Sequence, residues 1–241
     1  MLKVQDHRIR VAAGRREEMR NRLFVSALLL ASDTSIHDIG VDEIIAHAQV
    51  SRGTFYKYFT SVSVLYQDLA RRLAQELSST IEVVTLSSVE GAVRLASTSR
   101  VIMRLLVDLP TLGKLLIQLP WLNQNHKLDS FQTLRHEIEQ GIKAGIFEQV
   151  PVTIGLNLVI GSMVGGVHAM LLKPPSAGYE NIVIRQALIG LGLETSVAAK
   201  VSTIPLPATV PLLTGGVLEK IGMLHMTSTT LYGQNNPSSL S

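Results

Sequence analysis

Residues 42–59 read DEIIAHAQVSRGTFYKYF, and this stretch decides the fold. Apolar side chains recur at helical spacing through 41–48, and acidic residues such as Asp42 stand in the first turn, where they suit the positive end of a helix dipole. Ser51 is a favourable N-cap for a helix that follows directly. The stretch therefore predicts two short helices joined by a tight connector.

Two short helices at this spacing match a helix-turn-helix, in which the second helix presents an exposed face to the DNA major groove and the first braces it. Phe55 and Phe59 can point inward. The polar side chains left for the exposed face are Arg52, Thr54, Tyr56, Lys57 and Tyr58. Hydroxyls and a lysine suit phosphate oxygens, and an arginine can reach O6 and N7 of guanine. Other amphipathic helix pairs share this spacing, so spacing alone does not identify the motif.

The charge distribution points to a polyanionic partner. The chain of 241 residues has a net charge of +3 and only 17% charged residues. Residues 1–22 hold seven cations, Arg15 and Arg16 among them, against three acids. The rest of the chain holds 15 cations and 16 acids, so the excess of positive charge lies at the N-terminus. Nucleic acid, an anionic membrane surface and a merely solvated segment are all compatible with such a cluster.

The segment over residues 20–66 resembles the TetR-type bacterial transcription regulators. The resemblance rests on the order Val-Ser-x-Gly-Thr-x-Tyr-x-Tyr-Phe at 50–59, preceded by Asp42-Glu43-Ile44 and Ala48 and followed by Leu65. It implies an all-α homodimer with an N-terminal DNA-binding domain, a helical effector domain and no catalysis.

The resemblance also assigns roles within the motif. Thr54, Tyr56 and Tyr58 would hold backbone phosphates, and Arg52 and Lys57 would face bases or phosphates. Two further positions belong to this expected DNA-binding set: Gly53, which would allow close approach of the backbone to DNA, and the N-cap Ser51.

The sequence departs from the family pattern at three positions. Gln49 stands where many members have glycine, Gly40 where a threonine often caps the first short helix, and Val62 where a lysine commonly begins the next long helix. The cationic N-terminal segment, with Arg15 and Arg16, is expected to compensate by following phosphates or entering the minor groove.

The rest of the chain is predicted to be all-α. Helices are expected at 17–32, 88–107, 111–118, 128–144, 152–172, 180–193 and 195–202, with a long one beginning near 60. The expected organisation is a basic arm at 1–16, a helix-turn-helix domain at 17–62, a helical ligand-binding and dimerisation domain at 63–204, and an irregular tail at 205–241. A short ordered piece is expected around 217–225 within the tail.

A run of 24 residues without formal charge, Gln149–Leu172, raises the alternative of a membrane span. It contains the spacing Gly161-x-x-x-Gly165, which allows close helix contact in membranes. Polar residues, including Asn157 and His168, are costly in hydrocarbon, so a buried helix is favoured.

Composition and spacing argue against several other classes. The chain has no cysteine, so it holds neither disulfides nor thiolate metal sites. The histidines show no metal-ligand spacing, and no catalytic triad or phosphate loop is found. No metal site, cofactor or catalytic residue is expected, although a helical enzyme that binds a small molecule stays a weaker alternative.

The predicted function is that of a cytoplasmic homodimeric repressor, released from double-stranded operator DNA by a small, mostly apolar effector. The expected effector-binding side chains are Met103, Leu106, Trp121, Phe131, Met163 and His168. Dimerisation is expected on the helices at 152–172 and 180–193, whose glycines permit close contact. A membrane-anchored regulator using 149–172 is the other alternative.

Overall fold

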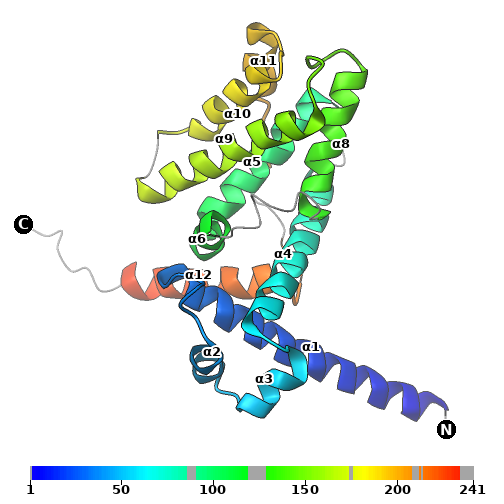
Figure 1. Cartoon of the computed structure of the whole chain (residues 1–241), viewed down its shortest axis with the longest axis vertical. Coiled ribbons are helices and arrows are strands. Elements are labelled where there is room, and N and C mark those ends of the chain that lie inside the picture. The colour runs from blue at the N-terminus through cyan, green and yellow to red at the C-terminus, as the bar shows by residue number, and fades with distance from the viewer. Residues whose placement is uncertain are drawn as a thin grey trace, which may run out of the picture. The chain divides into compact units, whose positions relative to one another are not determined.

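The computed structural model describes residues 2–85, 91–118, 129–173, 176–207, 212 and 214–233, with backbone alone at 2–9, 83–85, 116, 118, 129–131 and 226–233. Over these residues it contains eleven α-helices and no strand, which confirms the predicted all-α class (Figure 1). The chain divides into two compact units. Unit 1 comprises Met1–Arg72 and Thr214–Ser241, and unit 2 comprises Leu73–Leu213.

Unit 1 contains the predicted helix-turn-helix. Its helices are α1 (Leu2–Asp33), α2 (Val41–Ala48), α3 (Arg52–Tyr58), the first half of α4 (Val62–Thr85) and α12 (Val217–Gly233). Apolar side chains from the first four helices form its core, which includes Leu23, Phe24, Ile44, Phe55 and Leu65, each at most 2% exposed. The three-residue connector between α2 and α3, Gln49–Ser51, keeps them at a fixed offset.

The N-terminal segment differs from the expected separate arm. The backbone of 2–16 is helical and continues without a break into the part of α1 that packs in the core. Glycine at position 14 does not end the helix, because no special backbone conformation is needed there and neighbouring positions favour a helix. The basic cluster is therefore presented on a helix rather than on an extended strand.

The C-terminal segment also differs from the expected irregular tail. Residues 217–233 form α12, which is longer than the ordered piece expected at 217–225. This segment has few charges and a Ser/Thr-rich end, but it also carries a short apolar face that is buried in unit 1. The face is formed by Val217, Leu218 and Ile221. Such a face stabilises a helix only where a partner covers it, so local sequence alone underestimates the helix.

Unit 2 is a helical bundle built around α5. It contains the second half of α4, α5 (Ala92–Asp108), α6 (Pro110–Gln118), α8 (Asp129–Lys143), α9 (Val152–Leu172), α10 (Tyr179–Gly190) and α11 (Thr195–Val201). Helix α5 contacts α6, α8, α9, α10 and α11, and twelve of its seventeen residues are buried. A Cβ at Gly113 would lie only 2.5 Å from the carbonyl oxygen of Leu106, so glycine is what lets α6 approach α5 this closely.

Helix α9 is the one helix in the described part of the chain that could cross a membrane by length and composition. One side of it, from Gly155 through Ile160 and Met163 to Val167, is buried. Neighbouring helices α5, α6, α8 and α10 pack against it. This burial is what the alternative of a core helix predicts.

Candidate nucleic-acid interface

Helix α3 is positioned by its own N-cap and by two phenylalanines. The Oγ of Ser51 accepts a hydrogen bond of 3.1 Å from the backbone N–H of Thr54, and the two hydroxyl oxygens lie 2.9 Å apart. Phe55 and Phe59 are buried with ring centroids 6.0 Å apart, and Phe59 packs on Phe24 of α1 at 5.4 Å. These contacts fix which side of α3 faces the core.

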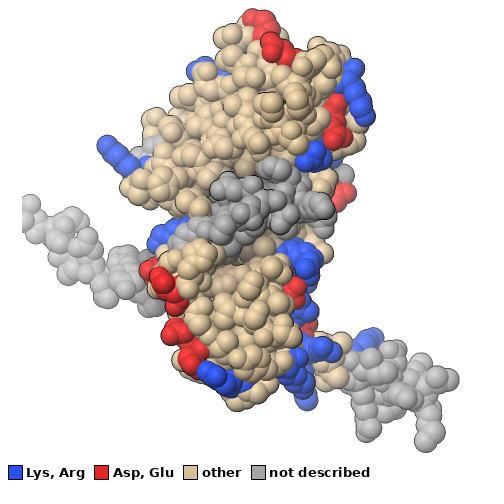
Figure 2. Space-filling model, viewed as in Figure 1, with Lys and Arg blue, Asp and Glu red and all other residues tan. Residues whose placement is uncertain are grey.

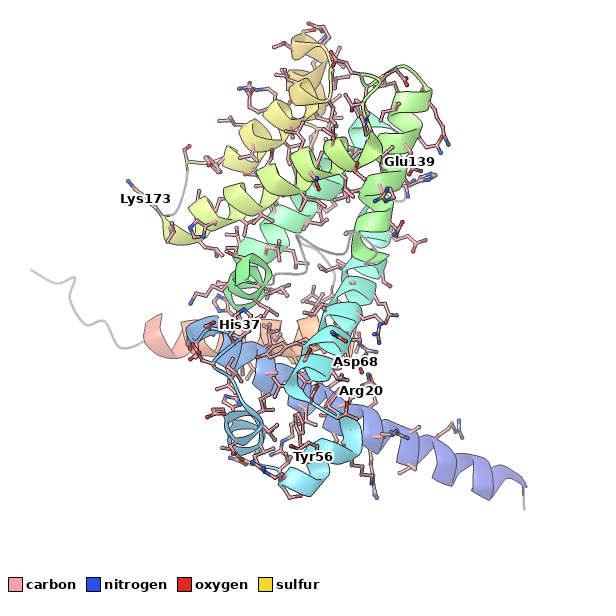
Figure 3. The ribbon with its side chains drawn as sticks, viewed as in Figure 1. Arg20, His37, Tyr56, Asp68, Glu139 and Lys173 are labelled. Atoms are coloured by element: carbon pink, nitrogen blue, oxygen red, sulfur yellow. The ribbon has the colours of Figure 1, made fainter. Side chains whose placement is uncertain are left out.

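The other side of α3 is exposed, as the spacing predicts. Arg52, Gly53 and Lys57 are exposed, Tyr56 is 50% exposed, and Thr54 and Tyr58 are half-buried. Tyr56 points away from the core of unit 1 in Figure 3. The structure thus brings the expected DNA-contacting side chains together on one short helix, where a cation and several hydroxyls can meet a phosphate backbone.

The glycine at position 53 has no internal packing role. A Cβ placed there would meet only the Ser51 Oγ, at 3.8 Å, which is an ordinary contact. Its φ is not in the left-handed region. The fold does not demand a glycine, which agrees with the expectation that this position lets an external backbone approach α3.

The turn before α3 contains a backbone conformation that its sequence does not favour. Gln49 has φ +52° and ψ +50°, the one positive φ at a non-glycine among the described residues. Its N–H donates to the carbonyl of Ala46 at 3.2 Å, and the N–H of Val50 donates to that of Ile45 at 3.0 Å. These bonds provide hydrogen-bond donors for carbonyl groups at the end of α2. The side chain of Gln49 makes the left-handed backbone conformation sterically unfavourable.

At the other two departures from the family pattern, the helix starts are stabilised by other side chains. The N–H of Gly40, at the start of α2, donates to Glu43 Oε2 at 3.0 Å, so a side chain within the helix occupies the cap. At the start of α4, Ser61 Oγ accepts from the N–H of Val64 at 3.2 Å. Both helix starts are stabilised without the threonine or the lysine.

Arg52 is held by an acid from the preceding helix. Its guanidinium donates to Asp42 Oδ1 at 2.5 Å, and both side chains are mostly exposed. This hydrogen bond to Asp42, together with the attraction between the charges, raises the pKa of Arg52. The pair links the first turns of α2 and α3 at the exposed face of the motif, a contact the sequence interpretation did not include.

Helix α1 is tied to α4 by a second set of contacts that sequence reasoning missed. Arg20 donates to Asp68 Oδ2 at 2.7 Å, and its guanidinium carbon lies 5.5 Å from the ring centre of Phe24 and 5.7 Å from that of Phe59 (Figure 3). The hydroxyl of Tyr66 donates to the carbonyl of Ala27 at 3.0 Å, and burial raises the pKa of Tyr66 to about 12. Only the count of N-terminal cations had drawn attention to Arg20.

The basic N-terminal helix is well exposed beside these contacts. Arg15 and Arg16 are both exposed, and the following acids are paired within unit 1, Glu17 with Arg72 at 3.2 Å and Glu18 with Lys220 at 2.7 Å. Blue atoms gather in Figure 2 along the side of unit 1 where α1 and the start of α4 run. This positive charge is available to an external polyanion.

The expected effector-binding residues divide into three groups. Met103 and Leu106 on α5 and Met163 on α9 are buried in unit 2. Trp121 and the side chain of Phe131 lie outside the described residues. His168 is exposed on α9, on the side of the helix opposite the buried Met163, so the structure does not bring it together with the other three.

Polar groups are buried close to the inward-facing methionine of α5. The side chains of Thr98, Ser99 and Arg100 are at most 2% exposed. Thr98 Oγ1, Ser99 Oγ and Arg100 Nε have no hydrogen-bond partner among the described residues, although Arg100 Nη1 donates to the carbonyl of Ile204 at 2.7 Å. Burial, reinforced by the nearby Arg104, lowers the pKa of Arg100. Sequence reasoning missed this polar group because its spacing matches no motif.

Helices α9 and α10 expose apolar and small residues. Ile154, Leu158 and Leu172 on α9 and Ile182 on α10 are between 36% and 74% exposed. Gly161 and Gly165 are exposed on α9, and a Cβ at either would meet nothing within 4 Å. Neither glycine is therefore needed for packing within the described chain.

Comparison with known proteins agrees with this architecture. The sequence profile of the bacterial regulatory proteins of the tetR family matches residues 23–69. Among curated proteins, none matches the chain. Several solved structures share its fold.

The structure of RolR in complex with resorcinol matches with a TM-score of 0.65 and 22% identity, over 83% of this chain and 100% of that one. A TetR-family transcriptional regulator of Syntrophomonas wolfei matches with a TM-score of 0.56 and 20% identity, over 80% and 100%. A gamma-butyrolactone receptor, described as an ArpA-like protein, matches with a TM-score of 0.54 and 17% identity, over 88% and 99%. The chain thus carries the N-terminal domain of the tetR family of bacterial regulatory proteins, within the all-helical fold of TetR-type transcriptional regulators.

Proposed function

We propose that the protein is a transcriptional repressor that binds double-stranded operator DNA as a cytoplasmic homodimer. The observation that carries the proposal is the exposed face of α3, where Arg52, Thr54, Tyr56 and Lys57 stand on a helix held rigidly by Phe55 and Phe59. A helix-turn-helix of this geometry reads the major groove with such side chains and anchors phosphates with its hydroxyls.

The test is selection of bound fragments from the source genome, followed by titration of the selected site. Tyr56→Ala should weaken binding to every sequence, since it removes a phosphate contact, whereas Arg52→Ala should also relax sequence preference. Gln132→Ala, an exposed change on α8, serves as the control. If no fragment is enriched over random DNA, the proposed function is wrong.

The dimer is proposed to form through the exposed face of α9 and α10. In the proposed complex, two α3 helices contact successive DNA half-sites about one helical turn apart, which requires two subunits. Gly161 and Gly165 leave space on α9 for a second backbone, and Ile154 and Ile182 supply apolar area. His168 lies on this same exposed side of α9 and is assigned to the dimer surface instead of the effector site.

The effector is proposed to bind inside unit 2, beside Met103, Leu106 and Met163, with Trp121 and Phe131 contributing. A site among such side chains favours a mostly apolar molecule. The unpartnered hydroxyls of Thr98 and Ser99 favour one that also carries one or two hydrogen-bonding groups, because a buried polar atom without a partner is costly. Resorcinol, named for RolR, and a γ-butyrolactone are suitable first probes.

Coupling is proposed to run through α4. This helix is continuous from Val62 to Thr85, while the boundary between the units falls inside it, after Arg72. An effector that binds one orientation of α4 better than another shifts the population of DNA-competent dimers. Operator binding titrated with each probe tests the coupling, and affinity that never changes on saturation with a bound probe contradicts it.

The two alternatives have less support. A membrane anchor would require the buried side of α9 to leave its contacts with α5 and α10. Fractionation of a tag-free chain with the soluble protein excludes that alternative. An enzyme would need convergent acid and base groups in one cavity, and finding histidine and acid side chains together beside Met103 would favour that alternative.

A further inference from the structure

The C-terminal helix α12 is packed into the unit that carries the helix-turn-helix. Val217, Leu218 and Ile221 on its first turns are at most 1% exposed, although the helix lies more than 180 residues after α1 in the sequence. Helix α12 contacts α1, and the two helices cross in Figure 1. The apolar side of the first turns of α12 is thus buried within unit 1.

Polar contacts fix the register of α12 on α1. The side-chain amide of Asn21, itself 2% exposed, donates to the carbonyl of Gly215 at 3.2 Å. The ammonium of Lys220 donates to both carboxylate oxygens of Glu18, at 2.7 and 2.8 Å. A buried amide that reaches a backbone carbonyl specifies one position of the two segments, because sliding by one turn would leave the amide unpaired.

Helix α1 is consequently held from two sides. Glu17 and Arg20 pair with Arg72 and Asp68 of α4. Glu18 and Asn21, on the neighbouring side of α1, bind the start of the C-terminal helix. Residues at i and i+3 lie on one face of a helix, so each pair forms a separate line of contacts.

We propose that α12 is a bracing helix of the DNA-binding unit, which fixes α1 and thereby the presentation of α2 and α3. Removal of α12 and the residues just before it removes the bonds that Glu18 and Asn21 of α1 make with Lys220 and Gly215. Operator affinity therefore depends on the last part of the chain, far from the motif in sequence. This dependence rests on the proposed binding of operator DNA, whereas the bracing itself does not.

The experiment compares two truncations of the full chain. The first ends after Pro207 and lacks α12, and its matched control ends after Gly233 and keeps α12. We expect faster amide hydrogen exchange in α1, α2 and α3 of the first protein, at least about tenfold, together with operator affinity lowered by about tenfold or more. Exchange in α5 and α9 of unit 2 should be unchanged, and the control should match the full chain in both measurements.

A pair of substitutions keeps the proposal testable if the short truncation does not fold. Leu218→Ala removes buried apolar contacts, whereas Met223→Ala changes a side chain that is 56% exposed on the same helix. We expect Leu218→Ala to accelerate exchange in α1–α3 and weaken operator binding, and Met223→Ala to have much smaller effects. Equal exchange and equal affinity in the Leu218→Ala protein and the full chain would overturn the proposal.

The two readouts separate this proposal from the proposed function. If the full chain binds no DNA but loss of α12 still accelerates exchange in α1–α3, the bracing role stands and the operator function fails. If the full chain binds its operator and the truncation ending after Pro207 binds equally well with unchanged exchange, the bracing role fails and the operator function stands.

Discussion

Asp42 at the start of α2 forms an ion pair with Arg52 at the start of α3. The arginine that the sequence analysis assigns to DNA contact is therefore paired with an acid. The pair lies on the exposed face of the motif, where both side chains are well solvated. An exposed ion pair is weak and exchangeable, so a phosphate or guanine can displace the carboxylate. In the proposed complex, we expect DNA to separate Arg52 from Asp42 and to place Asp42 near a polyanion.

Asp42→Asn is therefore expected to strengthen operator binding, by about two- to fivefold at low salt, because a negative charge near the phosphates is removed. Fluorescence anisotropy with labelled operator measures the change. Glu139→Gln, on α8, removes an acid from unit 2 and should leave affinity unaltered. Weaker binding by the Asp42→Asn protein would instead mean that Asp42 orients Arg52 for contact.

Gln49→Gly is expected to raise the free energy of unfolding by about 0.5–1 kcal/mol. Glycine enters the left-handed region without the steric cost that Gln49 bears at φ +52°, and this gain exceeds its extra entropy in the unfolded chain. Urea unfolding followed by circular dichroism provides the measurement. Ala46→Gly, in the interior of the same α2 helix, should lower stability by about the same amount, and stabilisation by both changes would contradict the explanation.

Tyr66→Phe is expected to lower stability by about 0.5–1.5 kcal/mol at neutral pH, through loss of the bond to the Ala27 carbonyl. The raised pKa of Tyr66, about 12, makes its contribution fully present below the ordinary value near 10 and lost as pH rises from there towards 12. The stability gap between the two proteins should close across that window. A gap that is constant from pH 9 to 12 would contradict the assignment.

Gly161→Arg is expected to convert the dimer to a monomer without unfolding it. The position has open space around it within the described chain, so the new side chain fits the subunit but blocks close approach of a second α9. Sedimentation velocity reports the mass, and circular dichroism reports the helix content. Gln132→Arg, which places the same side chain on the exposed side of α8, should stay dimeric.

Joint replacement of Arg15 and Arg16 by alanine is expected to lower the slope of log affinity against log salt by about 1.8, since each phosphate contact contributes about 0.9. Operator titrations at four salt concentrations give the slope. Lys200→Ala, an exposed cation on α11, should leave it unchanged. An unchanged slope in the double variant would remove this part of α1 from the interface.

The sequence was sufficient for most of the helices, although not for residues 2–16 of α1 or for the full length of α12, and for the composition of α3, because these depend on local spacing. The inward Phe55 and the outward Tyr56 follow directly from helical geometry. Gln49 was recognised as a departure from the family pattern, and its positive φ in the structure explains why glycine is usual there.

Contacts between distant segments were not predictable in the same way. Arg20 meets Asp68 across 48 positions, and Asn21 meets Gly215 across 194, and neither pair leaves a pattern in the chain. His168 was placed in the effector site because its run is uncharged, but α9 has one buried and one exposed side, and composition averages over both. Helix α12 was underestimated because its buried apolar side chains, Val217, Leu218 and Ile221, are covered by a unit whose other residues are distant in sequence.

Because translation proceeds from the N-terminus, the position of α12 in the sequence determines when the DNA-binding unit can be completed. Unit 2, Leu73–Leu213, is inserted between the two parts of unit 1, so α12 is synthesised after the other helices that the structure describes. A chain whose translation stops before residue 214 contains α2 and α3 but lacks the helix that is proposed to brace α1. If α12 braces α1 as proposed, such a fragment binds the proposed operator more weakly than a chain that contains α12.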